Sequence, residues 1–574
     1  SAASDVYKRQ VQGVTANVYH GQFSEGDGAR TQYDVVAGWS NDRASISVAA
    51  EHVEEKGVWA KDRGFSAYTY TDRHPDDGWT TVGQWGRIIG FKGPGCSSAR
   101  GCSYSLDRGS QPGGPDSFHL SDNTPFTGDV SNSNEQMHVQ TPIKRDSLFV
   151  DARMDLNDQI RFNTQLAYNR RTTTRQIAGY PFQSGAAGIT PMSADSWFNP
   201  FGSHHGYERP SDVHWNRRTW EIPRVSTSEL TTWQSVAAFE GSFQFAGRDF
   251  DWEAGYQYNR SELEQRATGN LHKQRVADST GPSFYNPATG KVECGTPDAP
   301  IAGCKPWNPL VPYGQDDPYG LTGNGELQDW LFPEELTRGR NTTRNLFASL
   351  SGGLATLPAG ELGFALGVES RREEGRFIPD ALAQTGATTN LAAGPTGGGY
   401  RVDEAYLELS VPVLSDLPGA RQLTLDMATR YSDYTTFGGT LNSKFGISWK
   451  PIDQLLVRGT WAQGFRAPTI SNLYGGGSQT FTTGFRDPCD TVYGAAASSP
   501  EVRARCAADI ANADSYRQLG QGNEPITGSS GQTPLPFTNG SNPDLKPETS
   551  TSRTLGLVWS PTFAEGLNLS LIHI

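Results

Sequence analysis

Aromatic, histidine and charged side chains are concentrated in one run of the sequence, "DSWFNPFGSHHGYERPSDVHWNRRTW", residues 195–220. Aromatic rings that stand beside amide and charged groups suit the stacking and hydrogen bonding of sugars or of catecholate-type iron chelates. We therefore treat this run as a candidate ligand-binding segment. The alternative is that the rings pack the segment against itself or its neighbours. The candidate residues are Trp197, Phe198, His204, His205, Tyr207, His214, Trp215 and Trp220.

The sequence gives little support for metal binding or for catalysis. His204, His205 and His214 lack the fixed spacing and the accompanying carboxylates of a metal site, so we predict no metal and no cofactor. The sequence contains neither Gly-x-Ser-x-Gly nor His-Glu-x-x-His, and its acidic residues are dispersed rather than converging. We predict no catalytic residues and no enzyme activity.

Six cysteines fall into three local pairs, each in a segment rich in Gly, Pro, Ser or Asp. Zinc would require closer spacing and further Cys or His partners. Disulfides that close loops are the better interpretation, and they require an oxidising compartment such as the periplasm or the cell surface. Six free thiols remain the alternative. The predicted pairs are Cys96 with Cys102, Cys294 with Cys304, and Cys489 with Cys506.

Composition indicates a β-rich chain of unusual kind. Hydrophobic residues make up only 35% of the 574 residues, yet aromatics reach 11% and glycine contributes 65 residues. Such a chain is too polar for one packed core of this size and too aromatic for disorder. No apolar stretch is long enough for a transmembrane helix, but a β-barrel exposes only every second residue to lipid. The net charge of −13 argues against nucleic acid as a partner.

The strands that must position these residues show a regular two-residue alternation. In "LFVDARMDLNDQIRFNTQLAYNRR", apolar and polar positions alternate on both sides of a turn at 157–159, which predicts a hairpin with one apolar face. About fifteen strands follow from this pattern. Tight turns near 41, 157, 247, 358, 418, 452 and 563 alternate with long segments, approximately 65–142, 180–228, 270–340, 379–400 and 468–548.

Long loops at alternate connections are typical of an outer-membrane barrel, which has short periplasmic turns and long extracellular loops. All three cysteine pairs fall in the long segments. The predicted fold class is therefore an all-β, antiparallel transmembrane β-barrel. An odd strand number indicates that part of the barrel is missing, since such barrels are even-numbered in bacteria.

The two ends of the chain share an unexpected relationship. Residues 5–10, "DVYKRQ", can be encoded by GAT-GTG-TAT-AAG-AGA-CAG, whose reverse complement encodes "LSLIHI", the sequence of residues 569–574. Residues 1–4 resemble the adapter that precedes this transposon-end sequence in sequencing libraries. We therefore predict adapter-derived scars at 1–10 and 569–574, with 11–568 an interior fragment of a longer protein.

Two further stretches resemble the barrel of TonB-dependent outer-membrane receptors. They are "LLVRGTWAQGFRAPTISNLYGGG", residues 455–477, and "NPDLKPETSTSRTLGLVWSP", residues 542–561. "WAKDRGFSAY" near the start is also similar to the early barrel of this family. The expected role of Arg466, Lys546 and Glu548 is structural: they form salt bridges that hold the root of the longest loop, or they contact the plug. The motif residues are Phe465, Arg466, Ala467, Pro468, Asn542, Pro543, Asp544, Leu545, Lys546, Pro547 and Glu548.

The resemblance implies a 22-stranded barrel, of which this chain supplies about fifteen strands and lacks the plug. It implies residence in the outer membrane of a Gram-negative bacterium, contact with outer-membrane lipid, and a partnership with TonB through the missing N-terminal region. It also implies active uptake of a scarce ligand by the full-length parent, such as siderophore-bound iron or an oligosaccharide. A secreted β-rich carbohydrate hydrolase and a surface adhesin are the alternatives. The sequence leaves the ligand open.

Overall fold

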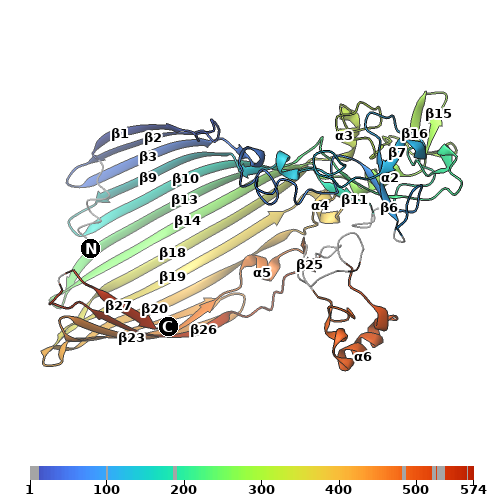
Figure 1. Ribbon diagram of the computed structural model, residues 1–574. Coiled ribbons are helices and arrows are strands. Elements are labelled where there is room, and N and C mark those ends of the chain that lie inside the picture. Colours follow the sequence, from blue (N-terminus) through green and yellow to red (C-terminus); the bar gives the residue numbers. More distant parts are fainter. Residues whose placement is uncertain are drawn as a thin grey trace.

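The computed structural model describes residues 12–98, 101–184, 191–480, 486–519, 525, 537–564 and 566–573. Its main feature is one antiparallel sheet of fifteen tilted strands in which sequence neighbours are also neighbours in space (Figure 1). The predicted strand number and fold class are confirmed. In sheet order the strands are β1 (Gly13–Gly21), β2 (Arg30–Ser40), β3 (Ala44–Glu55), β9 (Ile143–Asp155), β10 (Ile160–Ile177), β13 (Arg224–Phe245), β14 (Arg248–Thr268), β18 (Glu335–Leu357), β19 (Gly360–Ile378), β20 (Thr396–Leu417), β21 (Ala420–Tyr434), β22 (Gly438–Ile452), β23 (Leu455–Arg466), β26 (Glu548–Trp559) and β27 (Leu569–His573).

The predicted hairpin at residues 148–169 has the expected register. Phe162 lies opposite Met154, and Leu166 lies opposite Val150, so the apolar side chains share one face. The side chain of Asn157 closes the turn by accepting hydrogen bonds from the backbone N–H groups of residues 159 and 160. Alternation therefore placed these side chains on the correct faces of the sheet.

Connections at the two ends of the sheet differ in length. At one end lie the short turns 41–43, 156–159, 246–247, 358–359, 418–419, 453–454 and 560–568. The turn between β13 and β14 has positive φ at both central residues, Ala246 and Gly247, as a two-residue hairpin turn of this twist requires. The opposite end holds 56–142, 178–223, 269–334, 379–395 and 467–547, with two short connections, 22–29 and 435–437.

The long connections contain short elements of their own. Among the described residues, no helix is long and apolar enough to cross a membrane. The helices are α2 (Lys273–Thr280), α3 (Gly325–Leu331), α4 (Ala381–Thr385), α5 (Ile470–Tyr474) and α6 (Pro500–Asp509), with 3-10 turns η1 (Ala60–Asp62), η2 (Pro115–Ser117), η3 (Ser133–Gln136), η5 (Ser203–His205), η6 (Ala495–Ala497) and η7 (Ala513–Ser515). The short strands are β4 (Val58–Trp59), β5 (Arg87–Phe91), β6 (Cys102–Leu106), β7 (Phe118–Leu120), β8 (His138–Gln140), β11 (Pro181–Gln183), β12 (His214–Arg218), β15 (Ser283–Asn286), β16 (Lys291–Thr296), β17 (Ala299–Pro300), β24 (Ser478–Thr480) and β25 (Phe537–Asn539).

One face of the sheet carries a continuous apolar band, which we call the apolar face. Its members are exposed although they are large hydrophobic residues, and register places them side by side on successive strands. Toward the long connections the rings of Tyr168 and Trp233 lie 4.4 Å apart on this face. Trp449 and Trp559 lie on it near the short turns. Representative band residues are Phe239, Leu346, Leu366, Val368, Leu407, Leu441, Phe445 and Leu555.

The structure describes only one of the two predicted adapter-derived segments. Residues 1–10 lie outside the described residues, whereas Leu569–His573 form β27 and pair with β26. Within the described residues β1 pairs only with β2 and β27 only with β26, so the sheet is open between them. The adapter origin of both ends stays a prediction.

Candidate functional site

The connections 56–142, 178–223 and 269–334 pack together beyond one end of the sheet (Figure 1). Strand pairing links the first two, because Trp215 and Asn216 of β12 lie opposite Ile88 and Arg87 of β5. All three connections contribute to one buried apolar cluster, which we call the loop core. Its residues are Ile88, Tyr104, Phe182, Met192, Phe198, Phe201, Val213, Trp215, Leu271, Val276, Val292, Trp307, Leu310, Leu321, Leu327 and Leu331.

Part of the predicted ligand-binding run lies inside the loop core. Trp215 is 0% exposed, and its ring stacks on Phe182 at 4.6 Å and meets Trp307 edge-on at 5.3 Å. Phe198 and Trp220 are also buried. These three residues therefore occupy the packing positions that were the alternative to ligand contact, because an aromatic ring enclosed in a core presents no face to a ligand.

The remaining residues of the run lie closer to the surface. Trp197 is partly buried, with its ring 5.1 Å from that of His204, and Tyr207 packs against the loop core. His204 is exposed, with its ring 3.2 Å from the carbonyl oxygen of Asp195, and His205 is half-buried, with its ring 3.0 Å from the carbonyl oxygen of Trp197. His214 is exposed, 3.3 Å from the hydroxyl of Ser184. Their contact with a ligand remains a prediction.

Charged groups are buried between the three connections. Arg217 and Glu221 form an ion pair of 2.6 Å with side chains only 1% and 3% exposed. Arg218 donates to the carbonyl oxygens of Val82 and Gly179, and burial lowers its pKa to about 10, an effect to which nearby Arg224 adds. Arg218 is therefore charged at neutral pH and holds the first two connections together.

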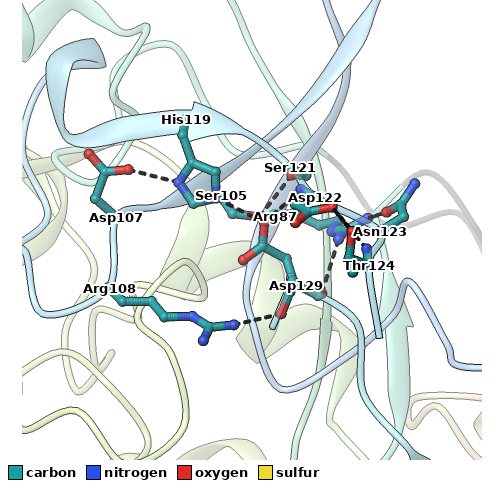
Figure 2. A network of polar contacts seen from close by, with 11 residues as sticks. Arg87, Ser105, Asp107, Arg108, His119, Ser121, Asp122, Asn123, Thr124 and Asp129 are labelled. Atoms are coloured by element: carbon teal, nitrogen blue, oxygen red, sulfur yellow. Dashed lines mark hydrogen bonds and ion pairs between the residues drawn. The ribbon is translucent and has the colours of Figure 1, made fainter. Parts of the chain in front are cut away.

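A polar network fixes the hairpin of the first connection, as Figure 2 shows. The ring of His119 lies between two carboxylates, 2.7 Å from Asp107 and 2.9 Å from Asp129. The buried guanidinium of Arg87 donates to the side chain of Asn123 and to the carbonyl oxygen of Asp129. Burial lowers the pKa of Arg87, and the charge of Asp129 acts in the opposite direction. These contacts make the network a structural support rather than an open site.

A second aromatic group lies on the first connection, with one exposed and two half-buried rings. Phe126 is 56% exposed, and its ring lies 4.8 Å from that of Trp79 and 6.3 Å from that of Tyr68. Its backbone has a positive φ of 66°, which non-glycine residues seldom adopt and which is concentrated at functional sites. We call Tyr68, Trp79 and Phe126 the aromatic platform. Sequence reasoning missed it, because its members are up to 58 residues apart, from Tyr68 to Phe126, and no periodicity links them.

The two motif stretches meet in space. Arg466 ends β23 and lies opposite Glu548, which begins β26, with an ion pair of 3.2 Å between them. The backbone N–H of Asn542 donates to the carbonyl oxygen of Asn472 in α5, which follows Ala467 and Pro468. The stretches therefore close the root of the 467–547 connection. Pro543, Leu545 and Lys546 are exposed beside this contact. Among the described residues Lys546 has no carboxylate within 4.0 Å, so the expected salt bridge is found for Arg466 and Glu548 but not for Lys546.

All three cysteine pairs form disulfides. Cys96–Cys102, Cys294–Cys304 and Cys489–Cys506 each close a segment within a long connection, and no cysteine is free among the described residues. Cys96 and Cys102 pack against the loop core, whereas Cys489–Cys506 joins α6 to the segment before it. Each disulfide restricts the unfolded loop, which stabilises the folded one.

Asp490 organises the segment 486–519. It is fully buried, and its carboxylate accepts backbone N–H groups of Val492, Tyr493 and Gln518 at 2.7–2.8 Å. Burial acts to raise the pKa of Asp490, but the hydrogen bonds outweigh it and hold the pKa below its ordinary value. The ionised carboxylate therefore stabilises the folded segment.

We expect this stabilisation to depend on pH. Because the folded-state pKa is lowered, the contribution is present above about pH 4 and is lost as the pH falls further. Hydrogen-exchange protection factors across 486–519 should therefore decrease in acid. Asp490→Asn should remove most of this pH dependence, while Asp509→Asn, an exposed site in the same segment, should keep it. Equal pH dependence in all three proteins would contradict the assignment.

The described residues contain no cluster of metal-ligating side chains. No group of three or more His, Cys, Asp or Glu side chains within them is arranged to hold a metal ion. What the fold presents is an antiparallel barrel wall with a loop assembly at one end, the architecture of a large β-barrel membrane protein.

Residues 307–574 match the family model described as "TonB dependent receptor-like, beta-barrel". The second half of the chain, from residue 307 onward, is therefore similar to the barrel of TonB-dependent receptors. None of the curated proteins matches the sequence.

Several solved structures are similar to the chain at low identity. A mutant of the ferric enterobactin receptor of Pseudomonas aeruginosa in complex with enterobactin has 11% identity and a TM-score of 0.43, over 98% of this chain and 54% of the other. The siderophore receptor PirA of Acinetobacter baumannii has 12% identity and a TM-score of 0.42, over 98% and 52%. The RagAB peptide importer has 9% identity and a TM-score of 0.40, over 92% and 42%. The chain spans about half the length of the two siderophore receptors.

Proposed function

We propose that residues 11–568 are the barrel portion of a receptor that takes up a scarce ligand across the outer membrane of a Gram-negative bacterium. The observation that carries the proposal is the asymmetry of the sheet, with every long connection at one end and an apolar band around the strands. Ligand binds among the long connections. Energy from the inner membrane, delivered by TonB to a plug that precedes the barrel, then releases the ligand inward.

The aromatic platform is our candidate for ligand contact. The exposed ring of Phe126, held in place by the half-buried rings of Tyr68 and Trp79, offers a stacking surface to sugars and to catecholates, with little loss of conformational freedom on binding. Siderophore-bound iron and oligosaccharides are therefore the two ligand classes that we propose. His204 and His214, which are also exposed, remain candidates for secondary contacts.

Ligand depletion tests this function. Cells that express the intact gene are incubated with a pool of ferric siderophores, oligosaccharides, cobalamin and peptides, and the medium is followed by mass spectrometry. We expect depletion of one class in cells with TonB and none in cells without it. Equal depletion without TonB, or conversion of the ligand in the medium, would contradict active uptake.

The platform makes a more specific prediction in the same assay. Phe126→Ala should slow depletion at low ligand concentration by about tenfold, the effect of losing one stacked ring of roughly 1–1.5 kcal/mol. Phe563→Ala is the matched control, because Phe563 is also exposed but lies in a short turn at the opposite end of the sheet. Unchanged uptake by Phe126→Ala would remove the platform from the binding site.

A further inference from the structure

The strands β18, β19 and β20 are neighbours in the sheet (Figure 1). Five exposed arginines gather on their apolar face. Register arranges them in two rows across the strands. Arg344 lies opposite Arg372, which lies opposite Arg401, and Arg340 lies opposite Arg376. We call these five residues the arginine rows. Like charges directly opposite each other in a sheet are destabilising, so this arrangement needs a reason outside strand stability.

On neighbouring strands, arginines at similar positions form ion pairs with carboxylates. On β10 and β13 Arg170 pairs with Glu229 at 2.7 Å, and on β14 Arg266 pairs with Glu264 at 2.9 Å. These two arginines are thus matched by carboxylates within the protein. The arginine rows depart from this pattern.

Two carboxylates partly compensate the rows. Glu374 binds Arg344 at 3.1 Å and Arg372 at 2.6 Å, and Asp403 binds Arg401 at 2.9 Å. Arg340 and Arg376, by contrast, have no carboxylate within 4.0 Å among the described residues. Glu262 of β14 lies opposite Arg340 in register but does not form an ion pair with it. The rows therefore carry an excess of positive charge, and two guanidinium groups retain their donors for another partner.

The space between the rows is recessed. Arg340, Arg372, Arg376 and Arg401 line a recess of about 940 Å³, together with the glycine-rich start of β20. Helix α5 packs on the opposite face of these strands, since a Cβ at Gly375 or Gly398 would meet Ile470 or Tyr474. The recess therefore opens on the apolar face and not toward α5.

The height of the rows relative to the apolar band limits what can reach them. Arg344 precedes Leu346 by two positions on the same face, which is about 7 Å along the strand. Beyond the hydrocarbon core of a bilayer, the headgroup layer extends roughly 5–8 Å on each side. A headgroup of a lipid whose chains cover Leu346 and Val368 thus lies level with the first row.

We propose that the arginine rows bind the phosphate groups of an anionic lipid in the leaflet that faces the long connections. Arginine suits this role because its planar fork donates two parallel hydrogen bonds to phosphate. The lipid phosphates neutralise the opposed arginines, and the acyl chains extend along the apolar band. This proposal rests on the membrane location proposed above. It concerns a surface separate from the aromatic platform.

Lipid titration of the purified full chain in detergent tests the proposal. The probe is bis-phosphorylated lipid A, with dephosphorylated lipid A and inorganic phosphate as separate arms, and binding is followed by native mass spectrometry. We expect the phosphorylated lipid to bind at least about tenfold more tightly than the dephosphorylated lipid. Arg344→Gln with Arg372→Gln, in the row that lies level with the headgroups, should weaken binding by about tenfold and remove most of the preference.

Matched variants make the result decisive. Arg421→Gln, on the apolar face beside the short turns, should leave lipid binding unchanged. Arg344→Lys with Arg372→Lys keeps the charge without the fork and should bind with intermediate affinity. Equal binding of both lipids, unchanged binding by the double Gln variant, or binding of inorganic phosphate without lipid preference would overturn the proposal. Because lipid binding is measured without TonB, its failure is distinguishable from a failure of the uptake function.

Discussion

Trp215→Ala should loosen the whole loop core while leaving the strands of the sheet intact. The side chain is fully enclosed between Phe182 of the second connection and Trp307 of the third. Truncating a buried tryptophan removes its contacts and leaves a cavity, which costs about 3–5 kcal/mol. Hydrogen exchange should therefore accelerate across 178–223 and 269–334, with protection in β18–β22 unchanged.

The adjacent residue supplies the control. His214 belongs to the same short strand, but its side chain is exposed, so His214→Ala should leave exchange unaltered. The experiment also separates packing from ligand contact. If Trp215 served ligand binding instead, its replacement would slow uptake without changing exchange in the ligand-free protein.

Arg217→Ala should have a comparable effect on the loop core through electrostatics. The guanidinium binds Glu221 at 2.6 Å and also donates to the carbonyl oxygen of Gln84 in the first connection. Glu221 in turn accepts a hydrogen bond from Thr322 in the third connection at 3.2 Å. Removing Arg217 leaves a buried carboxylate without its partner charge, which costs about 3–5 kcal/mol. Thermal unfolding followed by hydrogen exchange across the three connections measures the loss.

A double variant identifies the cause. Arg217→Met with Glu221→Leu removes both charges, so most of the lost stability should return. Arg466→Ala is the exposed comparison, because the Arg466–Glu548 pair is 66% and 73% exposed and water screens it, so only a small change is expected. If the double variant were as unstable as Arg217→Ala, lost packing rather than an unpaired charge would be responsible.

Strand positions could be predicted because their signal is local. Side chains alternate between the two faces of a strand, so Val150 and Leu166 had to share a face once the turn at Asn157 was recognised. Turn residues also act locally through their own side chains and φ angles. The positions of the long connections could also be predicted, because the residues between two predicted strands must form a connection.

Local sequence patterns did not predict which aromatic rings of the candidate ligand-binding run are buried. The run at 195–220 combines rings that the structure separates, with Trp215 in the loop core and His204 at the surface. Nothing in the composition of the run distinguishes the two environments. Burial depends on partners such as Phe182 and Trp307, which other connections supply.

The sequence by itself determined the class of fold, the three disulfide pairs and the resemblance to TonB-dependent receptors. These follow from period-two alternation, short cysteine spacings and contiguous motifs, all of which act over a few residues. Only the tertiary structure decided which aromatic rings are buried, that Phe126 meets Trp79, and that arginines of three strands form rows. Those features depend on strand register and on contacts between distant connections, because the free energy of such contacts is shared among segments that no local pattern relates.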